Sequence, residues 1–567
     1  MENLWKLKPL PDSKLVNSLQ ESLGVAPIVA TLLAQRGICT FEDAKQFFRP
    51  QLSQLYDPFL MKDMDKAVER LHTAITSHEK VLVYGDYDVD GTTAVSLMYL
   101  FLKNKCPQLE FYIPDRYEEG YGVSYKGIDY AHKNGFSLIV CLDCGIKAVE
   151  KVSYAKEKEI DFIICDHHRP GKKLPPAVAV LDPKRNDCDY PFKELCGCGV
   201  GFKLAQAYHQ HYELPFEDLV PLLDLVVVSI AADIVPIIDE NRVLAFYGLQ
   251  QLNSNPRIGL KALMHISNRK EKFNISDVVF GLAPRINAAG RIEHGNKAVE
   301  LLIQEDFSIA QAKAEYIDKH NLTRKELDQS ITKEALEMII PDAKSSVVYS
   351  EKWHKGVVGI VASRLIETHY RPTIVLTENK GKLTGSARSV SGFDVYNAID
   401  ACSDLLEQFG GHKYAAGLTM KKENIDAFVQ RFEEVVSTTI TDEMLKPTIS
   451  IDLEMSLQDI NNKTYRIVEQ MAPFGPANNR PVFMIEGLMD NGTGRLIGQD
   501  KTHLKLGITD EANSKTLDGI GFGMLHHFSS ITDKQNFDIC FVMDLNEWNG
   551  KTSLQLRLKD LRKNSLS

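Results

Sequence analysis

Short apolar runs alternate with segments of helical pattern between residues 80 and 239. Three of these runs, at residues 80–83, 137–142 and 161–165, have the length and composition of buried strands. Strands that are buried on both faces and separated by helices are typical of a parallel, doubly wound sheet. The hydrophobic pattern therefore predicts an α/β domain in this part of the chain.

The remainder of the chain is patterned differently. Helical periodicity dominates near the N-terminus and after residue 242, a second alternation of strands and helices follows, and short alternating strands end the chain. The last region has the size of an OB-type barrel, with Asn549-Gly550 as a hairpin turn. We expect an N-terminal helical segment (1–60), a parallel-sheet domain (61–242), a helical connector (243–340), a second α/β domain (341–445) and an all-β OB-type domain (446–567).

Individual elements are predicted within the last two domains. The pattern places strands at residues 346–349, 373–376, 383–388, 481–485, 503–507 and 553–558, and helices from residue 356 and over 425–436.

Composition limits the classes of function. The chain has 567 residues, too many for a single core, and a net charge of −10, which argues against a general binder of polyanions. Bound cations or clustered arginines can still outweigh the overall sign locally. Ten cysteines without a small-scaffold pattern favour reduced thiols and a cytoplasmic protein. The most apolar stretch, residues 219–238, contains Asp224 and Asp233, so we expect no membrane span.

Three alternating carboxylates, Asp86, Asp88 and Asp90, follow the first predicted strand. Open α/β sheets bind their ligands at this edge, beyond the carboxyl ends of the strands. Carboxylates this close repel one another unless cations neutralise them, and dense oxygen ligands suit Mg²⁺ or Mn²⁺ better than zinc. A polar Asp-Gly turn is the plain alternative, but three alternating Asp at a strand end favour metal binding.

Other apolar runs also end in polar residues. If all these runs are strands of one sheet, their ends meet at one edge and form a two-metal constellation, with cations roughly 3.5–4 Å apart. Taken singly, each Asp could instead cap a helix, and the histidines could lie on a polar loop. The residues are Asp143 after 137–142, Asp166, His167 and His168 after 161–165, and Asp233 after 219–232.

Several of these motifs occur together in a known superfamily. They are Asp86-Tyr-Asp-Val-Asp90, Leu142-Asp-Cys-Gly145, Asp166-His-His168, Ala232-Asp-Ile-Val-Pro236 and Gly410-Gly-His-Lys-Tyr-Ala-Ala-Gly417. The first four resemble the DHH phosphoesterase superfamily, and the last resembles the signature of its companion DHHA1 domain. Further motifs at 114–122, 283–291, 354–364 and 385–389 make residues 60–567 most similar to the RecJ family, 5′→3′ exonucleases specific for single-stranded DNA.

The resemblance implies that residues 61–242 form a DHH catalytic domain and residues 341–445 a DHHA1 domain. It also implies two divalent cations, Mn²⁺ or Mg²⁺, and a role in DNA repair and recombination. The residues implied as cation ligands are Asp88, Asp90, Asp143, His167 and Asp233, with Asp86 as an outer or bridging partner. His168 is expected to contact the scissile phosphate, and Asp166 to orient His167.

Arginines and glycines outside this cluster are candidates for binding the substrate phosphates. Arg388 with Ser386 offers a bidentate fork, and the glycines before His412 let an anion approach the backbone. Tyr121 is a candidate for stacking on a terminal base. For Arg116, Arg285 and Arg291 a structural salt bridge is an equally good interpretation. In the OB-type domain, Phe483, Phe522 and Trp548 suggest stacking rather than an electrostatic clamp.

Two other functions remain open at this point. One is another DHH–DHHA1 phosphoesterase acting on oligoribonucleotides or nucleotides, although such enzymes typically lack the last unit. The other is a non-catalytic DHH scaffold of the replication machinery, although such relatives have lost metal ligands that this chain retains. For an exonuclease we expect single-stranded DNA as substrate, a helicase or a single-strand-binding protein as candidate partners, and a monomer.

Overall fold

The protein is described by a computed structural model for residues 2–267, 269, 272–511, 515–532, 536–548 and 550–563. The chain forms two compact units. One contains Arg49–Glu326 together with the short segment Pro473–Asn479; the other contains Met1–Phe48, Leu327–Ala472 and Arg480–Ser567. No helix within the described residues is long and apolar enough to span a membrane.

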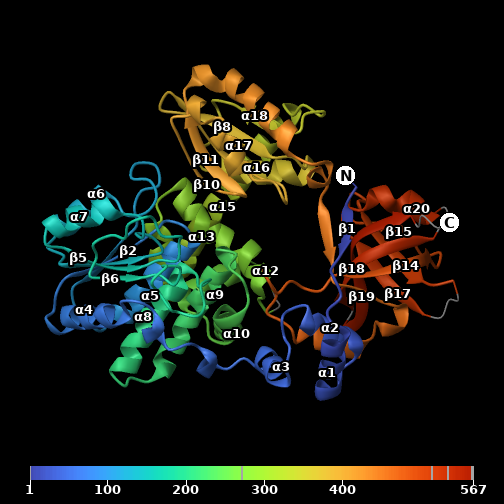
Figure 1. The fold of residues 1–567 in the computed structure, drawn as a ribbon, viewed down its shortest axis with the longest axis horizontal. Coiled ribbons are helices and arrows are strands. Elements are labelled where there is room, and N and C mark those ends of the chain that lie inside the picture. The colour runs from blue at the N-terminus through green and yellow to red at the C-terminus, as the bar shows by residue number, and fades with distance from the viewer. Residues whose placement is uncertain are drawn as a thin grey trace. The chain divides into compact units, whose positions relative to one another are not determined.

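The first unit is built on a parallel sheet, as predicted, and the sheet has five strands (Figure 1). Its strands, in spatial order, are β3 (Leu109–Tyr112), β2 (Val81–Gly85), β4 (Leu138–Leu142), β5 (Asp161–Cys165) and β6 (Ala179–Leu181). The outer strands β3 and β6 were not predicted. β2 and β4 are buried along their whole length, which explains why they are apolar without alternation.

Helices cover both faces of this sheet. Val83 and Val140 pack with one set of helices, and their neighbours Leu82 and Ile139 pack with the other, because successive side chains point to opposite faces. The first set includes α4 (Met64–Thr76), α5 (Val89–Leu102), α8 (Gly197–His211) and α9 (Leu223–Ala232); the second is α6 (Tyr125–Lys133) and α7 (Val149–Glu157).

The expectation that Asp233 ends a strand of this sheet is wrong. The apolar run before it forms the helix α9, and Asp233 is the C-cap residue of that helix. Nine of the ten α9 residues are buried, so the helix is apolar on all sides and has no polar stripe. A fully buried helix and a fully buried strand have the same apolar composition, so periodicity cannot separate them.

The segment after α9 is helical, as predicted. It contains α10 (Asp239–Ser254), α11 (Ile258–Ile266), α13 (Ala283–Ile292), α14 (Asn296–Leu302) and the 31-residue helix α15 (Phe307–Glu337). α15 carries the chain from the first unit into the second.

The second unit contains a mixed five-stranded sheet. Its order is β10 (Gln408–His412), β11 (Ala415–Met420), β9 (Lys382–Arg388), β8 (Thr373–Asn379) and β7 (Ser346–Tyr349). α17 (Val395–Asp400) and α18 (Ile425–Thr439) pack on one face, and α16 (Val358–Thr368) packs on the other. The strands and helices predicted for residues 346–436 are all present.

The C-terminal strands close into a barrel, which confirms the OB-type prediction. Neighbouring strands pair in the order β14 (Phe483–Asp490), β18 (Phe537–Trp548), β19 (Lys551–Lys563), β17 (Thr516–Gly521) and β16 (His503–Thr509), and β16 pairs back with β14. The turn between β18 and β19 contains Gly550, while Asn549 lies outside the described residues.

The N-terminal segment is not purely helical as expected. The helices α1 (Ser13–Leu23), α2 (Pro27–Ala34) and α3 (Phe41–Phe48) are present, but Leu4–Leu7 form the strand β1. β1 pairs in parallel with β12 (Thr448–Ile451), and Trp5 Nε1 donates to Asp560 Oδ2 at 2.8 Å. A four-residue strand whose partner lies more than 400 residues away leaves no local signal.

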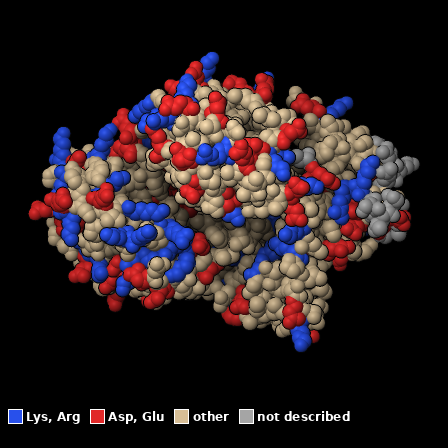
Figure 2. All heavy atoms as spheres, turned by 45° about the horizontal axis from the view of Figure 1, so that its top comes forward, with Lys and Arg blue, Asp and Glu red and all other residues tan. Residues whose placement is uncertain are grey.

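Charged side chains of both signs cover much of the visible surface (Figure 2). Basic side chains gather locally on this face although the chain has a net charge of −10. The overall charge therefore does not exclude a polyanionic substrate.

Candidate active site

The three carboxylates after β2 occupy different places at the start of α5. Asp86 is fully buried and accepts a long hydrogen bond from Gly122 N at 3.4 Å. Asp88 is the N-cap of α5 and accepts from Gly91 N at 3.0 Å, while Asp90 lies in the first helical turn. The alternating Asp residues are thus held by a strand-to-helix turn in which one carboxylate also serves as a cap.

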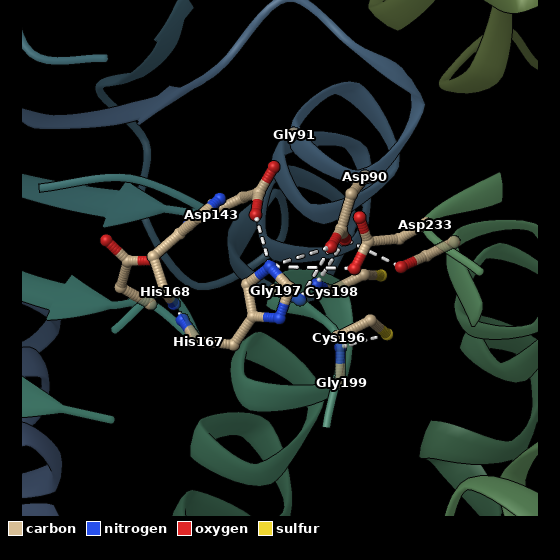
Figure 3. Close-up of polar contacts among 12 residues, drawn as sticks. Asp90, Gly91, Asp143, His167, His168, Cys196, Gly197, Cys198, Gly199 and Asp233 are labelled. Carbon is tan, nitrogen blue, oxygen red and sulfur yellow. Dashed lines mark hydrogen bonds and ion pairs between the residues drawn. The ribbon is translucent and has the colours of Figure 1, made fainter. Parts of the chain in front are cut away.

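Backbone N–H groups at the start of α8 donate hydrogen bonds to Asp90 (Figure 3). Its carboxylate accepts from Gly197 N and Cys198 N, each at 2.7 Å, and from Ser229 Oγ at 2.6 Å. A Cβ atom at Gly197 would lie 2.5 Å from Asp143 Oδ1, so only glycine fits between the two carboxylates. Gly197 is therefore part of the site, although the sequence analysis assigned it no functional role.

His167 lies at the centre of the cluster (Figure 3). Its Nε2 atom is 3.2 Å from Asp143 Oδ1 and 3.7 Å from both Asp90 Oδ2 and Asp233 Oδ2. Asp90 lies in α5, and the other three side chains follow the ends of β4, β5 and α9. The structure therefore brings together residues that are spread over 144 positions of the chain, from 90 to 233.

Burial and mutual repulsion make Asp143 and Asp233 hard to ionise. The pKa of Asp143 is well above its usual range because of burial and the charges of Asp90 and Asp88. Burial and the same two neighbours raise the pKa of Asp233 to about 8, although 32% of its side chain is exposed. Burial also lowers the pKa of His167, which keeps the imidazole neutral and able to coordinate a cation.

Several atoms of the cluster lack partners within the described part of the chain. Asp86 Oδ2, Asp143 Oδ1 and both ring nitrogens of His167 are buried without a hydrogen bond. Two groups, Asp143 with His167 and His168, and Asp90 with His167 and Asp233, each place their ligand atoms within 4.8 Å of one another. Unpaired buried oxygen and imidazole atoms are costly alone but suit divalent cations, so this donor set fits the expected metal ions.

His168 has a different environment from its neighbour. Its Nδ1 atom lies 2.7 Å from Asp166 Oδ1, and Asp166 also accepts from the backbone N–H groups of both histidines. Burial opposes charge on the ring, but the hydrogen bond and charge of Asp166 raise the pKa of His168 to about 9. Asp166 therefore orients His168, and the expectation that it orients the His167 ring is wrong.

Aromatic and basic side chains border this cluster. The hydroxyl of Tyr121 is 3.1 Å from His168 Nε2 and donates to Asp143 O at 3.2 Å, while half of the residue is exposed. The guanidinium of Arg116 lies 4.8 Å from the ring centre of Tyr87, and the charge of Arg291 also acts on Tyr87. The structure thus places Tyr121 beside Asp143 and His168, and Arg116 and Arg291 near Tyr87, which lies between Asp86 and Asp88.

Arg285 is engaged elsewhere. Its Nε atom donates to Asp318 Oδ1 at 2.8 Å and its Nη1 to Gly281 O at 2.5 Å. This is the structural salt bridge that the sequence left open as an alternative.

The Arg388 group, which we define as Ser386, Arg388 and His412, lies in the second unit. Arg388 in β9 and His412 in β10 are both in register with Ala415 of the intervening strand, so the two side chains share a face. Arg388 Nη1 donates to Ser386 Oγ at 2.7 Å, and no carboxylate among the described residues lies within ion-pair distance of the guanidinium. Burial without an acidic partner lowers the pKa of Arg388.

The aromatic residues suggested for the OB-type domain separate into different roles. Phe483 is fully buried against Phe541, so its proposed stacking role is wrong. Phe522 is 56% exposed and lies 5.2 Å from the ring of His503. The side chain of Trp548 lies outside the described residues.

Basic residues accompany Phe522 on the barrel. The strand pairing places Arg495, Lys505, Ile520 and Arg557 in one row across β15 (Arg495–Ile497), β16, β17 and β19. This face therefore combines an aromatic ring with cationic side chains, and is less purely aromatic than expected.

Three domain families match the chain in order. The DHH family N-terminal domain matches residues 80–230, the DHHA1 domain residues 342–438, and the RecJ OB domain residues 451–560. The single-stranded-DNA-specific exonuclease RecJ of Bacillus subtilis (strain 168) is 42% identical over 562 residues, covering 98% of this chain and 70% of that protein. The chain belongs to the RecJ family.

Other RecJ proteins support this assignment. The single-stranded-DNA-specific exonuclease RecJ of Escherichia coli (strain K12) is 32% identical, with 94% of this chain and 96% of that protein covered. The crystal structure of Thermus thermophilus RecJ in complex with Mn²⁺ superposes with a TM-score of 0.85 at 26% identity, covering 99% of this chain and 80% of that chain. The Mg²⁺ complex from the same organism gives a TM-score of 0.79 at 25% identity, with 99% and 79% covered.

Proposed function

We propose that this RecJ-family protein is a metal-dependent exonuclease that hydrolyses phosphodiester bonds of single-stranded DNA in the 5′→3′ direction. The observation that carries the proposal is the buried cluster of Asp90, Asp143, His167 and Asp233, in a chain that matches named RecJ exonucleases over nearly its whole length. A role in DNA repair and recombination follows from the family.

The proposed cation ligands are Asp88, Asp90, Asp143, His167 and Asp233, with Asp86 as an outer partner. The unpaired atoms of Asp143 and His167 support this assignment. When bound, two divalent cations supply an activated water and stabilise negative charge on the phosphoryl oxygens. Asp90 is kept in place by the two N–H groups of α8 and by Ser229, so it needs no side-chain rearrangement to bind.

His168 is proposed to act on the substrate. Its ring is largely protonated at neutral pH because of Asp166, and Nε2 faces the hydroxyl of Tyr121 at 3.1 Å. A protonated imidazole donates a charge-assisted hydrogen bond to a phosphate oxygen and stabilises charge that develops during bond cleavage.

The Arg388 group is proposed to bind a terminal 5′ phosphate. A Cβ at Gly359 in α16 would lie 3.1 Å from both Arg388 Nη2 and Ser386 Oγ, so this helix packs closely over the pair. A guanidinium without a carboxylate partner, beside a hydroxyl and on the same face as an imidazole, is a phosphate-binding arrangement. Arg116 and Arg291 are proposed as further phosphate contacts and Tyr121 as a stacking platform; Arg285 is left out because it is paired with Asp318.

The OB-type domain favours a DNA exonuclease over an oligoribonuclease or nucleotide phosphoesterase of the same superfamily. The barrel carries Phe522 and the cationic row described above, a combination suited to single strands. A monomeric state, a cytoplasmic location and a helicase or single-strand-binding partner are further proposals. All ten cysteines are free thiols, which supports a reducing compartment.

A single assay tests the function. Single-stranded DNA, duplex DNA and short RNA, each carrying a 5′ label, are incubated with the protein and Mn²⁺, Mg²⁺ or a chelator. We expect release of short products from the 5′ end of the single strand only, and none with the chelator. Equal cleavage of RNA, or processing from the 3′ end, would overturn the substrate or the polarity.

A further inference from the structure

A loop from the C-terminal region is built into the catalytic unit. Residues Pro473–Asn479 interrupt the segment matched by the RecJ OB domain, yet they belong to the compact unit that contains the catalytic sheet. The loop is folded on itself: Gly475 and Asn478 each donate a backbone hydrogen bond to the other at 3.0 Å. Asn478 is buried, and its Nδ2 atom donates to Pro473 O at 2.9 Å.

This loop contacts the segment that follows Asp233. Ile237 N donates to Pro476 O at 2.8 Å, and the Ile237 side chain is fully buried. A Cβ atom at Gly475 would lie 2.6 Å from Ile237 Cγ1, which is tighter than side chains tolerate. Only glycine at position 475 therefore allows the loop to sit against Ile237.

The backbone between Asp233 and Ile237 is strained. Ile234 has φ +60° and is 65% exposed, a conformation that a β-branched residue rarely adopts. Such strain persists only where the surrounding structure holds it. Asp233 N donates to Ser229 O at 2.9 Å on one side of Ile234, and Pro236 O accepts from Asn241 Nδ2 at 3.0 Å on the other. Next along the chain, the hydrogen bond from Ile237 N to Pro476 O holds this segment in place. Its acceptor, Pro476, lies outside the sequence of the catalytic domain.

We propose that residues 473–479 form a latch that positions Asp233 for cation binding, with Gly475 and Pro476 as positioning residues. The proposal rests on the proposed function, because it takes Asp233 as a ligand. It implies that a segment inside the region matched by the RecJ OB domain contributes to catalysis without touching the substrate.

The test is Mn²⁺ binding by the full-length protein, measured by titration calorimetry with Gly475→Ala. Partners that hold a metal ligand in place typically contribute 10- to 100-fold to metal affinity, so we expect about tenfold weaker binding. Gly281→Ala is the matched control in the same unit, because the nearest atom to its new Cβ is Phe273 Cε1 at 3.9 Å. Asp233→Ala is the reference for complete loss of the ligand.

Two further measurements separate positioning from stability. In metal-free protein, hydrogen exchange of the Ile237 amide should be at least tenfold faster in Gly475→Ala than in the wild type. Adding Ile237→Ala removes the overlapping Cγ1 atom and should restore Mn²⁺ affinity to within about threefold of the wild type. If Gly475→Ala alone does not fold, Mn²⁺ affinity and Ile237 amide exchange are measured on this double variant instead.

The outcomes are distinct. If Asp233→Ala weakens Mn²⁺ binding and Gly475→Ala lowers only the melting temperature, the latch is overturned and the proposed function stands. If Asp233→Ala binds Mn²⁺ like the wild type, Asp233 is not a ligand, and both the ligand set and the latch fail. Weakened binding in Gly475→Ala, restored in the double variant, supports the latch.

Discussion

The Nε2 atom of His167 lies 3.2 Å from Oδ1 of Asp143, and neither atom has a hydrogen-bond partner among the described residues. One atom is at the end of β5 and the other at the end of β4, on neighbouring strands of one sheet. Both are buried, so without a ligand each forfeits hydrogen bonds that water would supply. A divalent cation bound between them would relieve this cost. Substituting one of the two residues is therefore the most direct test of the metal site.

Asp143→Asn should therefore separate catalysis from folding. We expect turnover to fall at least a hundredfold, because the side chain keeps its shape but loses its negative charge. The metal-free variant should unfold at a higher temperature than the metal-free wild type. The raised pKa of Asp143 means that its charged form destabilises the folded state at neutral pH, and Asn removes that charge.

Turnover with saturating Mn²⁺ and thermal unfolding with and without chelator check this prediction. Asp65→Asn, an exposed residue in the first turn of α4, is the matched control and should behave like the wild type. A fully active Asp143→Asn would remove this residue from the ligand set.

His168 should matter for the chemical step and for its pH dependence. Because the folded-state pKa is raised to about 9, the ring is charged below that value and loses its charge as pH rises through it. We expect kcat with Mg²⁺ to decline above pH 9 in the wild type, and His168→Gln to lower kcat and lose that decline. Bound metal should stay at wild-type stoichiometry, measured by elemental analysis; loss of a cation would instead identify His168 as a ligand.

Arg388 should determine the response to a 5′ phosphate. Arg388→Lys keeps the charge but loses the planar fork, so we expect KM for 5′-phosphorylated single strands to rise about tenfold or more. KM for 5′-hydroxyl strands should change little, which is the comparison to measure. Arg431→Lys is the control, because Arg431 is an exposed residue of α18 that pairs with Asp404. An equal loss for both substrates would assign Arg388 to general stability.

Phe522 should contribute to the binding of long strands. Stacking of one base on an aromatic ring is worth about 1–3 kcal/mol, so Phe522→Ala should weaken binding of a long oligonucleotide roughly tenfold. Cleavage of a very short oligonucleotide should be unaffected. Binding isotherms for both lengths test this, with Leu545→Ala, a partly exposed residue of β18, as the control. Unchanged affinity for the long strand would make this face of the barrel a docking site for another molecule.

Phe522→Ala and its control Leu545→Ala test the role of the OB-type domain better than a truncation does. A chain that ends near Leu445 would lack Thr448–Ile451, the partner of β1, and would also lack Pro473–Asn479, which belong to the catalytic unit. Loss of activity after such a truncation would not distinguish DNA binding from folding.

The sequence by itself determined the three central strands of the catalytic sheet, β2, β4 and β5, and the chemistry at their ends, but not the outer strands β3 and β6. Runs such as Leu138–Leu142 are apolar because both faces of the strand are buried, and a carboxylate directly after such a run must lie at the edge of the sheet. For this reason Asp86, Asp90, Asp143 and His167 could be placed together from local pattern alone.

Only the tertiary structure decided the contacts between distant segments. It placed Asp233 on a buried helix, paired Asp166 with the His168 ring, and brought the start of α8 to Asp90. It also brought Pro476 to Ile237, across more than 200 residues. The hydrophobic pattern of a segment records whether it is buried but not what buries it, so partners that meet through packing leave no local trace in the sequence.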